Sequence, residues 1–223
     1  MENKFRPIVA KDNDFVEILN IPKEKEVPKF KKKTDLRKYL INKLNIAGDL
    51  KSEKANTVLH FGIDGTKRGI KYSNRKNQNQ FFADLENIIG RALCGGFIKA
   101  DYKHKIKNSN ILGQDVYFAS FNFNGNLYAV EIKADVFKNQ KSNKYSYAGH
   151  RIKEINLDAI KNSELHTENK SVNLTPSNLS ITYFKQIFKN NFVEYKEENF
   201  VKKYINTILI YIKKFLVKMK NNL

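Results

Sequence analysis

The sequence predicts an α+β fold: a small antiparallel sheet with helices packed on one face, plus a helical C-terminal extension. Residues 127–133 place Tyr128, Val130 and Ile132 on one face and Glu131 and Lys133 on the other, as a half-buried strand does, and residues 116–123 are expected to pair with them. Asn124-Gly125 between them tolerates the positive φ of a tight hairpin turn. Residues 81–93 place apolar side chains at helical spacing along one side. The hairpin and the helix can bury these apolar faces together, which leaves the other face of the sheet open.

Shorter elements precede this region. Residues 1–33 carry charges of both signs, three of the 4 prolines and short apolar islands at residues 15–19 and at Val27. We expect an arm or a pair of short elements that docks onto a body but forms no core alone. A short helix is predicted over residues 36–44 and is ended by Gly48. Residues 49–53 and 58–64 are expected to pair as strands.

Residues beyond the hairpin are expected to end in helices. Residues 145–157 suit a last strand, and residues 174–192 and 199–220 each carry an apolar stripe at helical spacing. The second stripe is rich in lysine and would also suit a membrane surface, but packing against the preceding helix is favoured because the stripes match. The expected organisation is an arm (1–33), an α+β domain (34–160), a linker (161–173) and a helical C-terminal extension (174–223).

The charge balance points to a polyanionic partner. The 223 residues carry 41 Lys plus Arg against 23 Asp plus Glu, a formal net charge of +18. Nucleic acid, with RNA favoured, is therefore the expected partner, and a host or defence-complex protein is the alternative. A composition that follows an AT-rich genome would give the same charge, but the clustering of charge near aromatic residues favours nucleic acid. One cluster is KFKKK at residues 29–33, which suits either solvent or phosphate contact.

The single cysteine, Cys94, excludes an internal disulfide and a thiolate zinc cluster, and its place in an apolar stretch suits packing. The first residues lack the apolar segment of a secretory signal, and no long apolar run is present. We expect a protein of the bacterial host cytoplasm.

Motifs for cofactor and metal binding are missing. GIDGTKRG lacks the spacing of a phosphate loop, and the 4 histidines are not at ligand spacing, so no cofactor and no metal are expected. The remaining residues suit metal-free cleavage of a phosphodiester. That reaction needs a base for the ribose 2′-hydroxyl, an acid for the leaving oxygen and cations for the phosphorane. His150 beside Arg151, and Lys133 beside Glu131, are residues of these types.

Several motifs follow one another within residues 36–157: K-R, S-N-R-K-N, a helix ending R-A-L, the strand G-N-L-Y-A-V-E-I-K, and Y-x-Y-x-x-H-R-I. This order resembles the phage-associated nuclease-like domains of the barnase–EndoU–colicin–RelE (BECR) superfamily, found in polyvalent proteins of phages and mobile elements. The resemblance implies helices on one face of an antiparallel sheet and a metal-independent RNA-cleaving site on the open face.

The resemblance also implies catalytic positions: Arg68 in the basic loop, Lys133 at a strand end, and Tyr147, His150 and Arg151 on the last strand. Nucleic-acid contacts are expected from the basic loop and from an aromatic ring able to stack on bases, namely Lys67, Lys71, Arg75, Lys76 and Phe118. The long C-terminal extension departs from the minimal domain, so the site is either intact or converted into a binding surface.

Each of these residues also has a structural alternative. His60, a weaker candidate base inside an apolar strand, is more often a satisfied, partly buried histidine. His150 stands in a turn-like polar context between Gly149 and Arg151, and Glu131 with Lys133 suits an ordinary exposed pair. Three functions remain open. The first is a toxin-like endoribonuclease of a phage or mobile element, with His150 as acid or base. The second is a non-catalytic protein that binds nucleic acid or a host protein, such as an anti-defence inhibitor. The third is a transferase for a nucleotide-type substrate.

Overall fold

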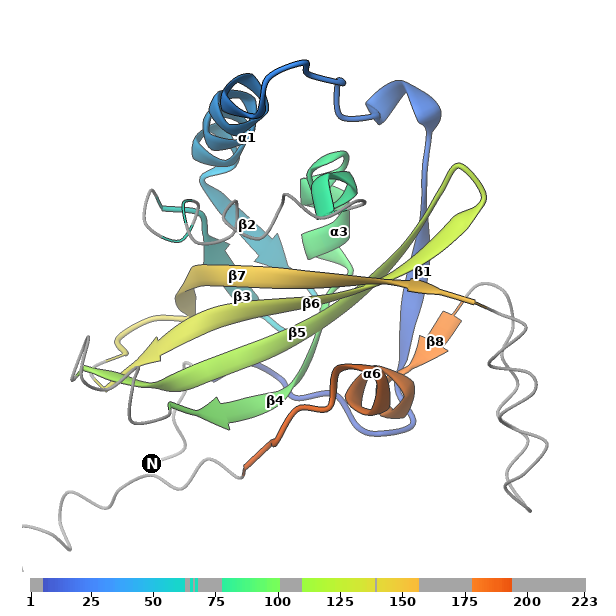
Figure 1. Cartoon of the computed structure of the whole chain (residues 1–223). Helices are drawn as coiled ribbons and strands as arrows, with labels where there is room; N and C mark the ends of the chain where they lie inside the picture. Colours follow the sequence, from blue (N-terminus) through green and yellow to red (C-terminus); the bar gives the residue numbers. More distant parts are fainter. Residues whose placement is uncertain are drawn as a thin grey trace, which may run out of the picture. The chain divides into compact units, whose positions relative to one another are not determined.

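The computed structural model describes residues 6–62, 65, 67, 78–100, 110–138, 140–156 and 178–193. The chain divides into a unit of Met1–Val193 and a second unit of Glu194–Leu223, and all described residues belong to the first. An eight-stranded sheet lies at its centre, ordered β2-β3-β7-β6-β5-β1-β8, with β4 paired to β5 (Figure 1).

The strands are β1 (Phe15–Ile21), β2 (Asp49–Ser52), β3 (Thr57–His60), β4 (Leu93–Lys99), β5 (Ile111–Phe123), β6 (Asn126–Phe137), β7 (Lys144–Ile155) and β8 (Asn178–Ser180). The helices are α1 (Lys33–Ala47), α3 (Leu85–Gly90) and α6 (Ile181–Phe188), with 3₁₀ turns η1 (Lys23–Lys25) and η2 (Gln78–Phe82).

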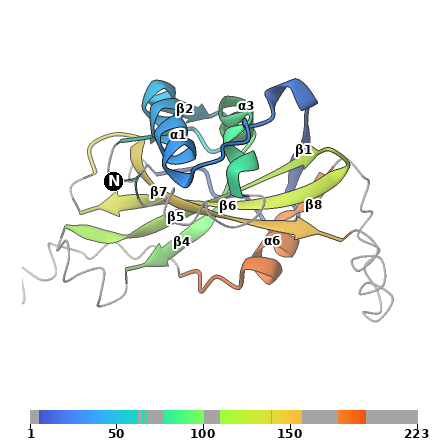
Figure 2. The same cartoon turned by 45° about the horizontal axis from the view of Figure 1, so that its top comes forward.

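The expected small antiparallel sheet with helices on one face is wrong. The sheet is mixed, because β1 runs parallel to β5 and β3 runs parallel to β7. Helices cover both faces, with α1 and α3 on one side and α6 on the other (Figure 2). Along β5, Val116 and Phe118 point to one core and Tyr117 and Ala119 to the other. A strand that is apolar on both sides needs cover on both sides.

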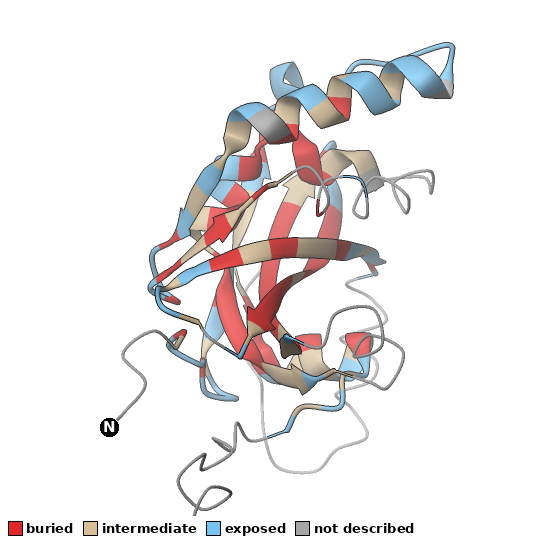
Figure 3. Ribbon diagram, turned by 90° about the vertical axis from the view of Figure 1, so that its left-hand side faces the viewer, coloured by how far each residue is buried: buried red, intermediate tan, exposed pale blue. Residues whose placement is uncertain are grey.

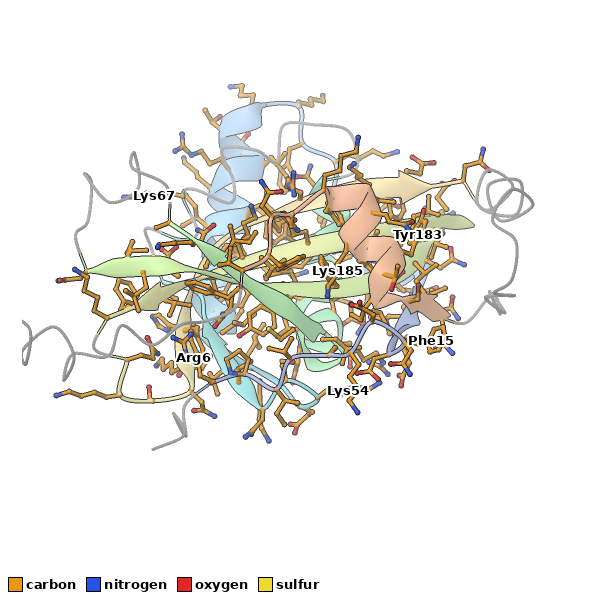
Figure 4. All side chains as sticks on the ribbon, turned by 90° about the horizontal axis from the view of Figure 1, so that it is seen from below. Arg6, Phe15, Lys54, Lys67, Tyr183 and Lys185 are labelled. Carbon is orange, nitrogen blue, oxygen red and sulfur yellow. The ribbon has the colours of Figure 1, made fainter. Side chains whose placement is uncertain are left out.

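Two hydrophobic cores result. On the α1 face, Leu40, Leu44, Ile88 and Ile89 pack with the inward residues of the sheet. On the α6 face, the helix lies across the sheet, as Figure 4 shows from below, and packs Ile181, Phe184 and Phe188 against it, together with Phe118. The Ser180 hydroxyl accepts a hydrogen bond from the Tyr183 amide and so caps the start of α6.

The N-terminal residues do not form a separate arm. Phe15–Ile21 form β1, which lies inside the sheet between β5 and β8. Val16 is fully buried and Ile21 is 5% exposed, so this strand contributes to both cores. The strand contains the apolar island at residues 15–19, but nothing in the surrounding prolines and charges indicated that these 7 residues enter the sheet.

The predicted helix over residues 81–93 is shorter than expected. It consists of η2 and the 6-residue α3, and the chain turns into β4 at Leu93. Gly95 lies within β4, where a Cβ atom would come within 2.2 Å of the Phe118 ring. Gly96 follows a β-bulge with φ +137°. The glycine pair therefore lets β4 approach the α6-face core closely.

Other local predictions are confirmed. Asn124 and Gly125 have φ of 51° and 79° and join β5 to β6 in a tight hairpin. β2 and β3 pair as expected, and Gly48 with φ 57° ends α1.

The expected linker, residues 161–173, lies outside the described residues, and so does most of the expected C-terminal extension. Within the part that is described, no helix has the length and apolar character needed to cross a bilayer.

Candidate nucleic-acid interface

His150, the predicted acid or base, lies in the core of the α1 face. Its side chain is buried, with only 4% of the residue exposed. Its ring stacks on Phe81 at 4.2 Å between centroids and meets the edge of Phe82 at 5.3 Å. Its Nδ1 lies 2.5 Å from the Tyr147 hydroxyl. The imidazole is thus enclosed by aromatic rings and offers no surface to an RNA backbone.

Arg151, the next residue, points to the α6 face. Its Nε and Nη2 donate to the two carboxylate oxygens of Glu131 at 2.7 and 2.5 Å, and Nη2 also donates to the Phe188 carbonyl at 3.1 Å. Glu131 is fully buried, and Lys133 and Asn190 complete its surroundings at 3.5 and 2.5 Å. The network compensates a buried carboxylate and ties the end of α6 to the sheet.

Of the other predicted site residues that the structure describes, Tyr147 and Phe118 are buried and Lys67 is exposed. Tyr147 is buried against Phe61 at 4.5 Å, and this burial raises the pKa of its hydroxyl. Phe118 is fully buried and stacks on Phe184 at 5.1 Å, so its ring is not available to a base. Lys67 is exposed and labelled in Figure 4. Four predicted residues lie outside the described part: Arg68, Lys71, Arg75 and Lys76.

The sheet therefore separates the predicted catalytic groups. His150 and Tyr147 lie on the α1 face, whereas Lys133 and Arg151 lie on the α6 face. An acid or base and a stabilising cation have to reach the same phosphate, and these side chains do not. No three side chains of His, Cys, Asp or Glu in the described ranges lie together as a metal site requires.

His60, a weaker candidate base, belongs to an ion-pair group at the sheet edge. Its Nδ1 lies 2.6 Å from Asp49, and the Lys144 ammonium reaches the same carboxylate at 2.6 Å. Hydrogen bonds from Lys144 and then from His60 hold the pKa of Asp49 below its usual value. Asp49 belongs to β2, His60 to β3 and Lys144 to β7, so these ion pairs link three neighbouring strands at the edge of the sheet.

Exposed cations gather instead around the start of α1. We define the α1 cationic segment as Lys29, Lys31, Lys32, Arg37 and Lys38, all of which are exposed. None of the five forms an ion pair with another described residue. Only one acid, Asp35, lies within residues 29–38. The start of α1 is correspondingly pale blue in Figure 3.

Some other lysines of the body are paired with a carboxylate, unlike those of the α1 cationic segment. Lys51, Lys54, Lys144 and Lys185 each have a carboxylate oxygen within 2.7 Å. The partners come from the same loop or from neighbouring elements, namely Glu53, Glu17, Asp49 and Asp12. The α1 cationic segment is therefore a local concentration of charge that the described residues leave uncompensated.

The helix itself adds to this positive field. Lys32 is the N-cap of α1 and makes no side-chain cap. The N-terminal end of a helix carries partial positive charge and normally attracts acidic side chains, so lysines there repel it. This repulsion is a cost in the free protein, and an anion held by the same lysines would relieve it.

An aromatic pair, Phe30 and Tyr39, accompanies the α1 cationic segment. Phe30 is 36% exposed and packs on Tyr39, with 5.4 Å between the ring centroids and 42° between their planes. The Lys43 ammonium lies 5.8 Å from the Tyr39 ring centroid and also reaches the Ala83 carbonyl at 3.5 Å. Cations and an exposed ring on one surface are typical of proteins that bind single-stranded nucleic acid.

An acidic groove limits this surface. A groove of about 760 Å³ runs between α1, the segment after η1 and the start of α3. Carboxylates outnumber lysines in its lining, with Glu24, Glu26, Asp49, Asp84 and Glu86 against Lys25 and Lys43, and Lys25 pairs with Asp84 at 2.9 Å. Their charge repels a polyanion, so the cationic interface lies outside the groove, along the exposed start of α1.

The sequence alone identifies the KFKKK run as a possible phosphate contact, but it does not predict that Phe30 and Tyr39 pack together. Phe30 and Tyr39 are nine positions apart and belong to different periodic patterns. Their contact depends on how the chain turns into α1, which residue spacing does not reveal. An aromatic residue inside a lysine run was the only available signal.

Comparison with known proteins gives no relative. No protein-family model, no curated protein and no solved structure matches this chain. The resemblance to the BECR superfamily is neither supported nor contradicted by these comparisons, so it stays a prediction.

Proposed function

We propose that this chain binds nucleic acid, with RNA favoured over DNA, through the α1 cationic segment. The observation that carries the proposal is the set of five exposed cations, in residues 29–38, that form no ion pair with the described residues. Released counterions supply most of the free energy when such cations meet phosphates. A single strand contacted by all five would give a salt slope of roughly −3.5, because each contact contributes about −0.7.

Binding fits the described geometry better than cleavage does. The Arg151 guanidinium is bound to the buried carboxylate of Glu131, and aromatic core residues enclose His150. The metal-independent endoribonuclease remains a prediction, with Lys133 and Arg151 as the described cations that it would use. The phage or mobile-element origin and a host or defence-complex partner are untested predictions as well.

The test compares two triple variants of equal charge. Lys29, Lys31 and Lys32 are replaced by glutamine in the first, and the paired lysines Lys51, Lys54 and Lys144 are replaced by glutamine in the second. Affinity for a short single-stranded RNA is measured by fluorescence anisotropy over a range of salt concentrations. We expect the first variant to lower the magnitude of the salt slope by about 2, and the second to change it little.

Each outcome decides something. Equal effects of the two triple variants would show that net charge, and not the α1 cationic segment, attracts RNA. A flat salt dependence of the wild type would exclude a nucleic-acid partner. Cleavage of the RNA by the wild type without divalent metal, abolished by Lys133→Ala, would establish the endoribonuclease instead.

A further inference from the structure

Phe30 is an exposed ring that is already held in place. Tyr39 supports one side of it, at 5.4 Å between ring centroids. Tyr39 is in turn held by α1 and by the Lys43 ammonium on its ring. A ring fixed in this way loses little conformational freedom when a flat ligand stacks on it, so binding costs less entropy.

The neighbours of Phe30 are suited to a phosphate chain. Lys29 and Lys31 flank it in sequence, and Lys32 follows at the helix start. All three are exposed and without an ion pair among the described residues. A nucleotide whose base lies on Phe30 would thus have ammonium groups beside the phosphates on either side of that base.

We propose that the α1 cationic segment recognises unpaired nucleotides, with one base stacked on Phe30 and its flanking phosphates held by Lys29, Lys31 and Lys32. This inference rests on the proposed function and adds the class of nucleic acid. A duplex hides the faces of its bases in the stack, so it can use the lysines but not Phe30.

A single strand fits this surface better than a membrane does. A membrane anchor of this kind needs a broad apolar face, whereas Phe30 is one ring with lysines on both sides in the sequence. The other exposed apolar side chain near the helix, Ile46, is in the last turn of α1, at the opposite end from Phe30, so the two do not form one apolar face.

The experiment uses the full chain with Phe30→Ala, Phe30→Trp and Phe15→Ala. Phe15 is the matched control, because it is 43% exposed but lies on β1 (labelled in Figure 4). Probes are a labelled oligouridylate, an RNA duplex of equal length and phosphatidylglycerol vesicles. Thermal unfolding checks that every variant is folded.

Phe30→Ala is expected to weaken oligouridylate binding roughly 5- to 150-fold, as the loss of one stacked base does. The factor should be the same at every salt concentration, since no phosphate contact is lost. Duplex binding should not change, Phe30→Trp should bind the oligouridylate as wild type does, and Phe15→Ala should have no effect.

Failure of this inference can be told from failure of the proposed function. If Phe30→Ala leaves oligouridylate binding unchanged while the triple lysine variant still weakens it, stacking is refuted and nucleic-acid binding stands. If neither change matters, both proposals fall. Loss of vesicle binding alone in Phe30→Ala would assign the surface to a membrane, and equal losses for single strand and duplex would also overturn the inference.

Discussion

His150 and Arg151 are adjacent in β7, and their side chains lie on opposite faces of the sheet. His150 stacks on Phe81 in the core of the α1 face. Arg151 binds Glu131 and the carbonyl of Phe188 on the α6 face. Neighbours in a strand alternate between faces, so an H-R pair inside a strand does not form one site. Both residues support the fold, and their roles can be measured separately.

Arg151→Ala is expected to destabilise the protein by about 2–4 kcal/mol in urea unfolding. It leaves the buried Glu131 carboxylate with only Lys133 and Asn190 as partners. The double variant Glu131→Gln, Arg151→Ala removes the stranded charge and should recover part of the loss. Equal stability losses for the single and the double variant would show that the buried carboxylate is not the cause.

Replacing His150 by alanine is expected to cost about 2–4 kcal/mol, because the cavity lies among Phe81, Phe82 and Tyr147. His150→Phe keeps the stacked ring and should cost less, although it leaves the Tyr147 hydroxyl without its His150 contact. RNA affinity should be unchanged in both variants. A large loss of RNA binding in a fully folded His150→Phe variant would show that His150 does contribute to the RNA-binding site.

Stability is expected to fall as the pH rises from 4 to 8. Burial raises the pKa of the Asp115 carboxyl from 3.8 to about 7, and the nearby Arg6 acts in the opposite direction. The folded state holds this proton more tightly than the unfolded state does. The resulting stability is present in full below about pH 4 and is lost as the pH rises through about 7, by at most about 4 kcal/mol.

Asp115→Asn is the matched test of that pH dependence. Its melting temperature should fall less between pH 4 and 8 than that of the wild type, whatever its stability at either end. Parallel curves for the two proteins would show that another group titrates.

Gly65→Ala is expected to destabilise the fold by more than about 2 kcal/mol. A Cβ atom there would lie 1.9 Å from the Tyr147 carbonyl oxygen, and backbone cannot move aside as a flexible side chain can. Gly90→Ala in α3 is the control, since its Cβ would meet nothing within 4 Å. It should be neutral or stabilise by up to about 1 kcal/mol. Similar urea midpoints for the two variants would contradict this account.

Local elements were predictable wherever the pattern was periodic and the turn chemistry clear. The β5–β6 hairpin with Asn124-Gly125 and the end of α1 at Gly48 follow directly from residue types. The helix expected over residues 81–93 failed at its end, because an apolar run that continues into a strand keeps its hydrophobicity while its period changes.

The site was less predictable than the elements. Assigning His150 and Arg151 to one open face assumed that the sheet had an uncovered side, and α6 covers that side with Phe184 and Phe188. Whether a strand is buried on both faces depends on segments far away in the chain. The one local sign was the apolar run at residues 116–119, which is typical of a strand buried on both faces and marks Phe118 as a core residue.

The place of β1 has a consequence for synthesis on the ribosome. This strand leaves the exit tunnel before both of its neighbours, because β5 begins at Ile111 and β8 at Asn178. One of its hydrogen-bonding edges can pair once β5 is made, but the other stays open until nearly all of Met1–Val193 has been translated. Final closure of the sheet should therefore be slow and late, and a nascent chain stalled before β8 would be the species most prone to aggregate or to engage a chaperone.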